Sequence, residues 1–173
     1  MTPLTVIAPQ HRLMISLNYQ IKPSGHHDSQ IDLSAFLLNR TKQLASEKHL
    51  VFYNNVSTPN KSVALTETNG NQVQKCISID FLTIDAEVEE LMIYASVYDA
   101  ETNKLTFSAF TECEVQITAS NFTSPIYISD LIRDHASDSS IEIAWIKRWK
   151  RFWVADRFSV AAAGMHETTE KYL

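Results

Sequence analysis

Apolar and polar residues alternate with a period of two over most of the chain. In the clearest case, Leu13, Ile15 and Leu17 alternate with Met14 and Ser16. This spacing is typical of a strand with one buried face, because successive side chains of a strand point to opposite faces of its sheet. The same alternation returns in the segments 31–37, 77–81, 91–97, 113–117 and 141–145. The pattern predicts about nine to eleven strands.

Turn-forming residues separate these segments. Asn, Gly, Pro and Asp occur in the stretches 22–29, 54–61, 68–71 and 100–104, and such residues favour chain reversals. Many short strands with regular turns predict an all-β fold, a two-sheet antiparallel β-sandwich. No linker or repeat divides the chain, so we expect a single domain over residues 1–173. The one helix expected is a short C-terminal one near 159–172, or else an irregular tail that frays from Met165 onward.

Strand phase also predicts which side chains form the core and how the two cysteines differ. The predicted core includes Leu13, Leu33, Ile79, Ile93 and Val115. Cys113 follows the apolar phase of its strand, which predicts a buried thiol, whereas Cys76 is out of phase and should be more accessible. Two distant cysteines form neither a disulfide framework nor a zinc site, so we expect two free thiols in a reducing compartment.

Charge and hydropathy exclude several classes of protein. The formal net charge is −5, whereas a nucleic-acid-binding domain is usually basic enough to neutralise several phosphates. No segment is long and apolar enough for a transmembrane helix, and the first residues lack the basic region of a signal peptide. We therefore expect a cytoplasmic protein that binds no nucleic acid and has no transmembrane segment.

Three segments, in this order, resemble the tellurium-resistance (TerD-like) stress-protein family: Ile31-Asp-Leu-Ser-Ala-Phe-Leu-Leu, Leu50-Val-Phe-Tyr-Asn-Asn and Ile93-Tyr-Ala-Ser-Val-Tyr-Asp-Ala. Residues 143–155 are similar to the last hairpin of that family, so the resemblance extends over residues 11–160. It implies a β-sandwich that binds calcium through an acidic Asp-x-Asp segment and an acidic, glycine-rich loop. It also implies a role in tellurite and stress responses without an established catalytic activity.

The resemblance implies a set of candidate calcium ligands, which are Asp28, Asp32, Glu67, Asn69 and Asp99. Gln30 stands where the family has the first aspartate of its pair, and the acidic loop is reduced to residues 65–72. The glycine-rich segment expected near the C-terminus is replaced by residues 156–163. Calcium affinity falls as carboxylates are lost, so we expect a weak site of about 10⁻⁴ to 10⁻³ M with Asp32 as its most important ligand. The alternative is that these residues only form turns and solvated edges.

Other candidate sites are weaker. His26 and His27 are adjacent, so on an extended chain they point opposite ways and are poorly placed for one zinc ion. Cys76 has only Lys75 beside it to favour a thiolate. The basic and aromatic segment 145–153 is expected to form a hairpin whose aromatic rings cover the sandwich edge while Lys147, Arg148, Lys150 and Arg151 stay solvated.

These observations lead to three functional hypotheses. The first is a non-enzymatic stress-response module that binds calcium weakly or binds a protein partner within a stress-response complex. The second is a metal-free assembly component of such a complex. The third is an enzyme with a dispersed active site, which the lack of a dense His, Asp, Glu and Ser constellation disfavours.

Overall fold

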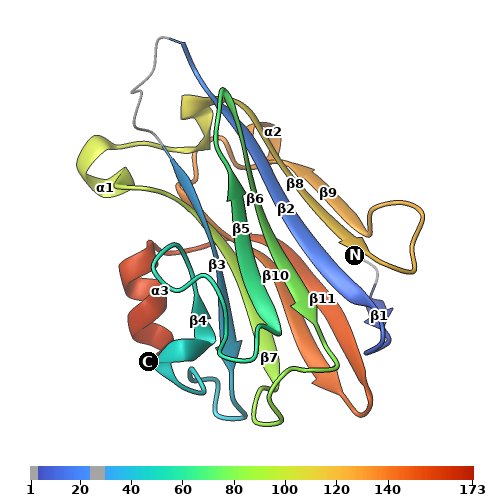
Figure 1. Cartoon of the computed structure of the whole chain (residues 1–173). Helices are drawn as coiled ribbons and strands as arrows, with labels where there is room; N and C mark the ends of the chain where they lie inside the picture. Colours follow the sequence, from blue (N-terminus) through green and yellow to red (C-terminus); the bar gives the residue numbers. More distant parts are fainter. Residues whose placement is uncertain (1–3, 24–29) are drawn as a thin grey trace.

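Two antiparallel sheets packed face to face form the molecule in the computed structural model, which describes residues 4–23 and 30–173 (Figure 1). The strands are β1 (Thr5–Ile7), β2 (Arg12–Ile21), β3 (Ile31–Leu38), β4 (Leu50–Val51), β5 (Val63–Thr68), β6 (Gln72–Asp80), β7 (Glu90–Val97), β8 (Phe110–Ala119), β9 (Tyr127–Asp130), β10 (Ser140–Trp149) and β11 (Phe152–Ala161). One sheet has the order β1-β11-β10-β7-β3-β4 and the other the order β5-β6-β2-β8-β9. The predicted all-β sandwich is confirmed.

The main core fills the space between the two sheets. Along β2, residues Leu13, Ile15 and Leu17 are completely buried and lie opposite apolar residues of β8. On β6 the first two also lie opposite isoleucines, whereas Leu17 lies opposite Lys75. All five residues predicted as core are at most 1% exposed: Leu13, Leu33, Ile79, Ile93 and Val115. The alternation therefore assigned the faces of these strands correctly, because one face of each is removed from water.

The outer face of the six-stranded sheet carries a second, smaller apolar cluster. It contains Phe36, Leu38, Leu50, Met92, Tyr94, Trp145 and Tyr172. Tyr172 belongs to the C-terminal helix α3 (Met165–Tyr172), which lies beside β4 in Figure 1, and its ring is 5.7 Å from that of Phe36. Because α3 covers this face, β3 and β7 are buried on both sides over most of their length.

The predicted short C-terminal helix is confirmed, but its start and the expected fraying of its residues need correction. The helix begins at Met165, since β11 continues to Ala161, and the expected start near residue 159 is wrong. The expectation of a frayed tail is also wrong, because Tyr172 is 2% exposed and its backbone oxygen accepts a hydrogen bond from Leu44 N at 2.7 Å. Burial of one aromatic ring and one backbone bond hold this polar helix in place.

Short helical segments occur where turns or strand ends were expected. The turn predicted at 100–104 contains helix α1 (Ala100–Asn103), flanked by Asp99 and Lys104 with φ of 51° and 52°. Helix α2 (Leu131–His135) is capped by Asp130, whose side chain accepts from two backbone N–H groups. Two 3-10 helices, η1 (Glu47–His49) and η2 (Phe107–Ala109), precede β4 and β8. No helix in the described ranges is long and apolar enough to cross a membrane.

Candidate functional site

An internal ion pair lies at the position where the resemblance implied a metal. Lys75 takes the inward phase of β6, in step with Ile77 and Ile79, and its side chain is only 3% exposed. Its Nζ is 3.3 Å from Asp32 Oδ1 on β3 and 3.9 Å from Glu67 Oε2 on β5. A buried ammonium group is costly unless opposite charges offset its lost hydration. The two carboxylates supply those charges, and the pairing joins the two sheets.

Asp32 and Asp99 also line one cavity of about 380 Å³ at this end of the sandwich. Asp99 follows β7 in left-handed backbone, and its Oδ2 accepts a hydrogen bond from Asn103 Nδ2 at 3.1 Å. Aromatic and charged side chains form much of the wall, namely Asp32, Tyr53, Tyr98, Asp99, Glu101 and His166. The structure thus brings together two of the predicted ligands and connects a third, Glu67, to Asp32 through Lys75.

The remaining predicted ligands do not add to this group. Asn69 lies exposed in the turn between β5 and β6, and its side chain makes no hydrogen bond to another described residue. Asp28, like His26 and His27, lies outside the described residues. Calcium takes six to eight oxygen ligands, several of them carboxylates. The donor set fits such an ion poorly, because Asp32 already faces an ammonium group and Asp99 a side-chain amide.

Burial raises the pKa of both cysteine thiols. The two cysteines are free, as expected, and Cys113 is 3% exposed while Cys76 is half-buried. Burial, assisted by the negative charge of Asp130, raises the pKa of Cys113 to about 12. Burial also raises the pKa of Cys76, and this effect is larger than that of a hydrogen bond with Ser16, which lowers the pKa. A protonated thiol is a weak nucleophile, so neither side chain is prepared for thiolate chemistry.

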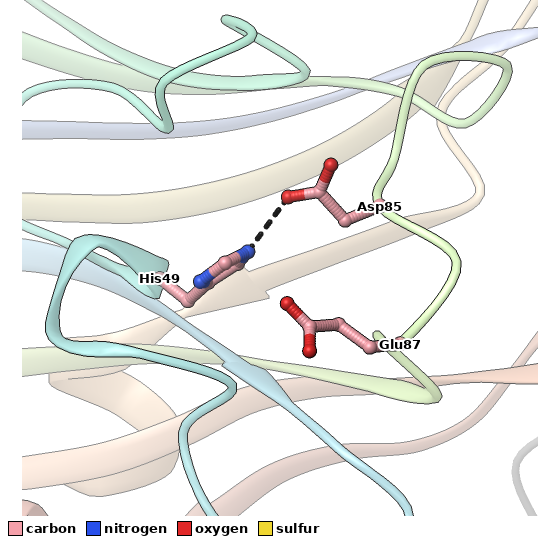
Figure 2. Close-up of side chains that lie close together, drawn as sticks. All are labelled: His49, Asp85 and Glu87. Atoms are coloured by element: carbon pink, nitrogen blue, oxygen red, sulfur yellow. Dashed lines mark hydrogen bonds and ion pairs between the residues drawn. The ribbon is translucent and has the colours of Figure 1, made fainter.

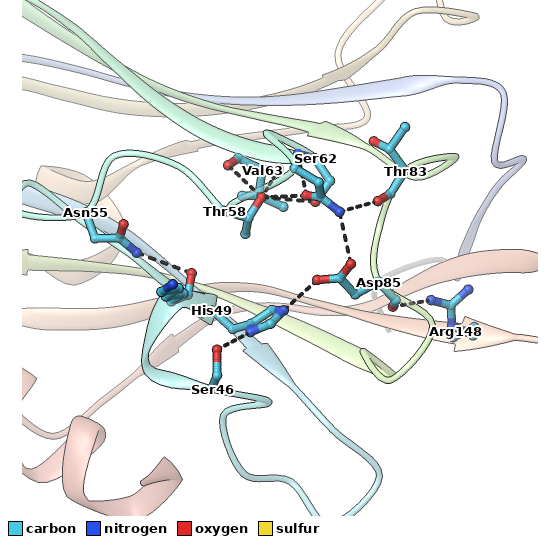
Figure 3. A network of polar contacts seen from close by, with 11 residues as sticks. Ser46, His49, Asn55, Thr58, Ser62, Val63, Thr83, Asp85 and Arg148 are labelled. Carbon is cyan, nitrogen blue, oxygen red and sulfur yellow. Dashed lines mark hydrogen bonds and ion pairs between the residues drawn. The ribbon is translucent and has the colours of Figure 1, made fainter.

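A polar network joins three loops near the opposite end of the molecule, beside the start of β7 (Figure 3). His49, which ends η1, is 5% exposed. Its Nδ1 is 2.8 Å from Ser46 Oγ, and its Nε2 is 2.8 Å from Asp85 Oδ2. Asn60 Nδ2 donates to Asp85 Oδ1 at 3.1 Å, and Arg148 Nη2 donates to the backbone oxygen of Asp85 at 3.3 Å. The network therefore fixes the position of the Asp85 carboxylate.

Glu87 adds a second carboxylate beside this network. One ligand atom each from His49, Asp85 and Glu87 lies within 4.8 Å of the others, and Figure 2 shows the three side chains pointing toward one another. Sequence reasoning missed this cluster, because 36 residues separate His49 from Asp85. The only local signal is the pair of acidic residues at positions 85 and 87, which is common in exposed loops.

The basic and aromatic segment forms the predicted hairpin. β10 and β11 pair from Ile141↔Ala161 to Trp149↔Phe152, and Lys150 makes the turn with a φ of 54°. Lys147 pairs with Asp156 at 3.1 Å. The expectation that Arg148 stays solvated is wrong, because its side chain is 27% exposed and donates to the backbone oxygens of Val88 and Asp85. Its guanidinium also lies 4.4 Å from the centroid of the Trp153 ring.

Comparison with protein families gives one match that spans nearly the whole chain, the TerD domain, over residues 2–171. Among curated relatives, the uncharacterized protein YceE of Bacillus subtilis is 27% identical over 152 residues, which are 83% of this chain and 79% of the relative. General stress protein 16U of the same organism is 24% identical, over 83% of this chain and 75% of its own length. Tellurium resistance protein TerD of Serratia marcescens is 20% identical, over 87% and 81%.

A solved structure supports the same fold. The crystal structure of a homologue of telluride resistance protein (TerD) from Streptomyces coelicolor A3(2) superposes with a TM-score of 0.74. It covers 88% of this chain and 90% of that chain, at 10% sequence identity. At this identity the likeness concerns the arrangement of the two sheets and not the residues of any site.

Proposed function

The chain belongs to the TerD domain family, and from this premise we propose that it is a non-enzymatic binding module of a cytoplasmic stress response, which engages a protein partner without calcium. Two of its relatives are named tellurium resistance protein TerD and general stress protein 16U, which supports a role in that kind of response. The alternative is a module that binds calcium weakly through Asp32.

The position of Lys75 favours the calcium-free module over the calcium-binding alternative. Its ammonium group already supplies positive charge to Asp32 and Glu67, at 3.3 and 3.9 Å. Two unit charges about 4 Å apart interact by about 4 kcal/mol at an effective dielectric constant of about 20. A divalent ion at Asp32 would be repelled by the ammonium group with an energy of that order or larger. The ion pair therefore acts as a built-in substitute for a bound cation.

The state of the thiols supports a non-enzymatic role. Burial raises the pKa of both Cys113 and Cys76, which lowers the thiolate fraction of each below that of an ordinary cysteine. The cavity between Asp32 and Asp99 is lined by tyrosines and carboxylates and has no cysteine in its wall. Two free cysteines also suit the reducing interior of a cell.

The same cavity offers the surface for a partner. Tyr53 and Tyr98 are 56% and 55% exposed beside Asp99 and Glu101. Exposed tyrosines combine apolar area with a hydroxyl group and are enriched in protein interfaces. Carboxylates around them favour lysine or arginine side chains on the partner, through charge and through contact with the aromatic rings. We therefore propose a partner that presents a basic segment to this end of the sandwich.

Thermal melts across a calcium series test the metal-free proposal. We expect the melting temperature of the wild-type protein to stay constant up to tens of millimolar calcium. A calcium site with a Kd of about 10⁻⁴ M would stabilise the fold by about 2.7 kcal/mol at a hundredfold excess of ion, which is about 10 mM. The matched variant is Asp32→Asn, which removes one carboxylate charge. It should melt lower than the wild type by the same amount with and without calcium.

The calcium-free and calcium-binding proposals predict different responses of the melting temperature to calcium. If calcium raises the melting temperature of the wild type and Asp32→Asn abolishes that rise, the calcium-binding alternative is correct. A calcium-independent difference between the two proteins supports Asp32 as the partner of Lys75.

A further inference from the structure

The network around His49 contains the parts of a metal site that neither the family match nor the partner proposal uses. His49 Nε2 points from a buried ring toward the carboxylates of Asp85 and Glu87 (Figure 2). Asp85 is 41% exposed at its side chain and Glu87 is exposed, so an ion has access from solvent. The cluster lies near the start of β7, at the end of that strand away from the residues paired with Asp32.

We propose that His49, Asp85 and Glu87 form a binding site for a divalent transition-metal ion of the Zn²⁺ type. Nε2 of His49 and one carboxylate oxygen from each acid supply three ligands, and water completes a tetrahedral shell. One imidazole with two carboxylates suits ions of borderline softness, whereas calcium prefers an all-oxygen shell with more ligands.

Neighbouring side chains already hold two of the ligands in place. Ser46 Oγ lies 2.8 Å from His49 Nδ1, where it can accept the Nδ1 proton while Nε2 binds the ion. Asn60 donates to the second oxygen of Asp85 at 3.1 Å. Such outer contacts select the tautomer and the orientation of metal ligands, and are a regular feature of zinc sites.

Binding requires a small local adjustment. Zinc ligands at about 2.0–2.2 Å from the ion lie roughly 3.3–3.6 Å from one another in a tetrahedral shell. His49 Nε2 and Asp85 Oδ2 are closer, at 2.8 Å, because a hydrogen bond joins them. The ion would replace this hydrogen bond and separate the two atoms by about half an ångström. The exposed side of the Asp85 carboxylate leaves room for that movement.

A simpler role for His49 is that of a structural contact that ties η1 to the loop before β7. Glu87 separates the two roles, because its side chain makes no hydrogen bond or ion pair with any other described residue. A purely structural network does not need Glu87, whereas a metal site does. Glu87→Gln is therefore the informative variant, and it should fold normally because the side chain is exposed.

The test is a titration with Co²⁺, followed by visible absorption, and then displacement by Zn²⁺. The matched control is Glu47→Gln, which removes the same charge from an exposed position on the 3-10 helix that ends at His49. We expect the wild type and Glu47→Gln to show the same four-coordinate cobalt spectrum and the same Zn²⁺ affinity. Glu87→Gln should lose the spectrum, and Ser46→Ala should weaken Zn²⁺ binding about 10- to 100-fold.

Two results would overturn the proposal. One is a wild-type protein that gives no cobalt spectrum and no Zn²⁺-dependent rise in melting temperature. The other is binding that Glu87→Gln leaves unchanged, which would show that Glu87 is not a ligand and that the proposed three-residue site does not exist. Melts without metal should give Glu87→Gln the midpoint of the wild type, so that a loss of binding cannot be a loss of folding. A negative result leaves the calcium series at Asp32 unaffected, because the two experiments probe different residues.

Discussion

At the scale of single residues, Lys75 and Asp32 illustrate how unequal the two halves of an ion pair can be. The Lys75 side chain is 3% exposed, whereas Asp32 retains 17% of its side-chain surface and Glu67 retains 37%. Removing the carboxylate leaves an ammonium group that cannot reach water. Removing the ammonium group leaves carboxylates that can still be hydrated.

This asymmetry predicts the order of stability of three variants. Asp32→Asn should lower the free energy of unfolding by about 3 kcal/mol, near the lower end of the range for breaking a buried pair, because Glu67 still faces the ammonium group. Lys75→Met should cost less, since its chain still fills the core and no charge is left buried. The double variant should be more stable than Asp32→Asn alone. Denaturant unfolding of the four proteins in a double-mutant cycle measures these differences, and strictly additive effects would show that the pair contributes nothing.

At the scale of elements, helix α3 is held by its contacts with the sheet and not by its own sequence. It has eight residues, far fewer than an isolated helix needs to be stable in water. Tyr172 packs against Phe36 and lies 6.1 Å from the ring of Trp145. The helix in turn shields this face of the six-stranded sheet from solvent.

Substitution at Tyr172 tests this dependence. Tyr172→Ala should lower the free energy of unfolding by about 3 to 5 kcal/mol, the usual cost of truncating a buried aromatic ring. It should also increase binding of a hydrophobic dye, because Phe36 and Trp145 become accessible. His166→Ala is the matched control on the same helix, since His166 is 81% exposed at its side chain. Equal stability of the two variants would contradict the account of how α3 is held.

The same elements show why the strands were easier to predict than the helix. In β2 one face is buried and the other carries mainly polar residues, so alternation identified both its phase and its core residues. In β3, Phe36 and Leu38 are buried on the outer face, and the alternation is lost because α3 covers them. The sequence of α3 is mostly polar. It therefore gave no sign that Tyr172 packs against Phe36, which lies far away in the chain. Local periodicity indicates that one face of a strand is buried, but it does not identify the distant element that covers that face.

At the scale of the whole molecule, the candidate site was only partly predictable for the same reason. The family resemblance placed Asp32 and Asp99 at one end of the sandwich, and they do line one cavity. The ammonium group that pairs with Asp32 comes from the other sheet, 43 residues further along the chain. His49 and Asp85 meet across a comparable separation. Such pairings depend on how distant segments pack in the folded chain, and a short sequence motif contains no information about that packing.

Partner binding is also a property of the whole molecule, because it depends on which end of the sandwich is used. We expect the double variant Tyr53→Ser, Tyr98→Ser to lose the proteins that the wild type captures from cells that express it naturally. Trp149→Ser is the control, because Trp149 is 53% exposed and lies beyond the Glu90 end of β7, opposite Tyr98. Mass spectrometry of the captured proteins measures the difference. Capture that survives the double variant but not Trp149→Ser would place the interface at the β10–β11 turn.

The order of strands in the sheets has a consequence for synthesis of the chain. β2 lies between β6 and β8, and the contact of Arg12 N with Ser120 Oγ joins residues 108 positions apart. Translation at about 5–20 residues per second leaves β2 without β8 for roughly 5 to 20 s. β1 stays unpaired for longer still, because it pairs with β11, which ends at Ala161. Until then the growing chain exposes apolar strands with unpaired edges, and their premature association with other chains is the main hazard of its folding.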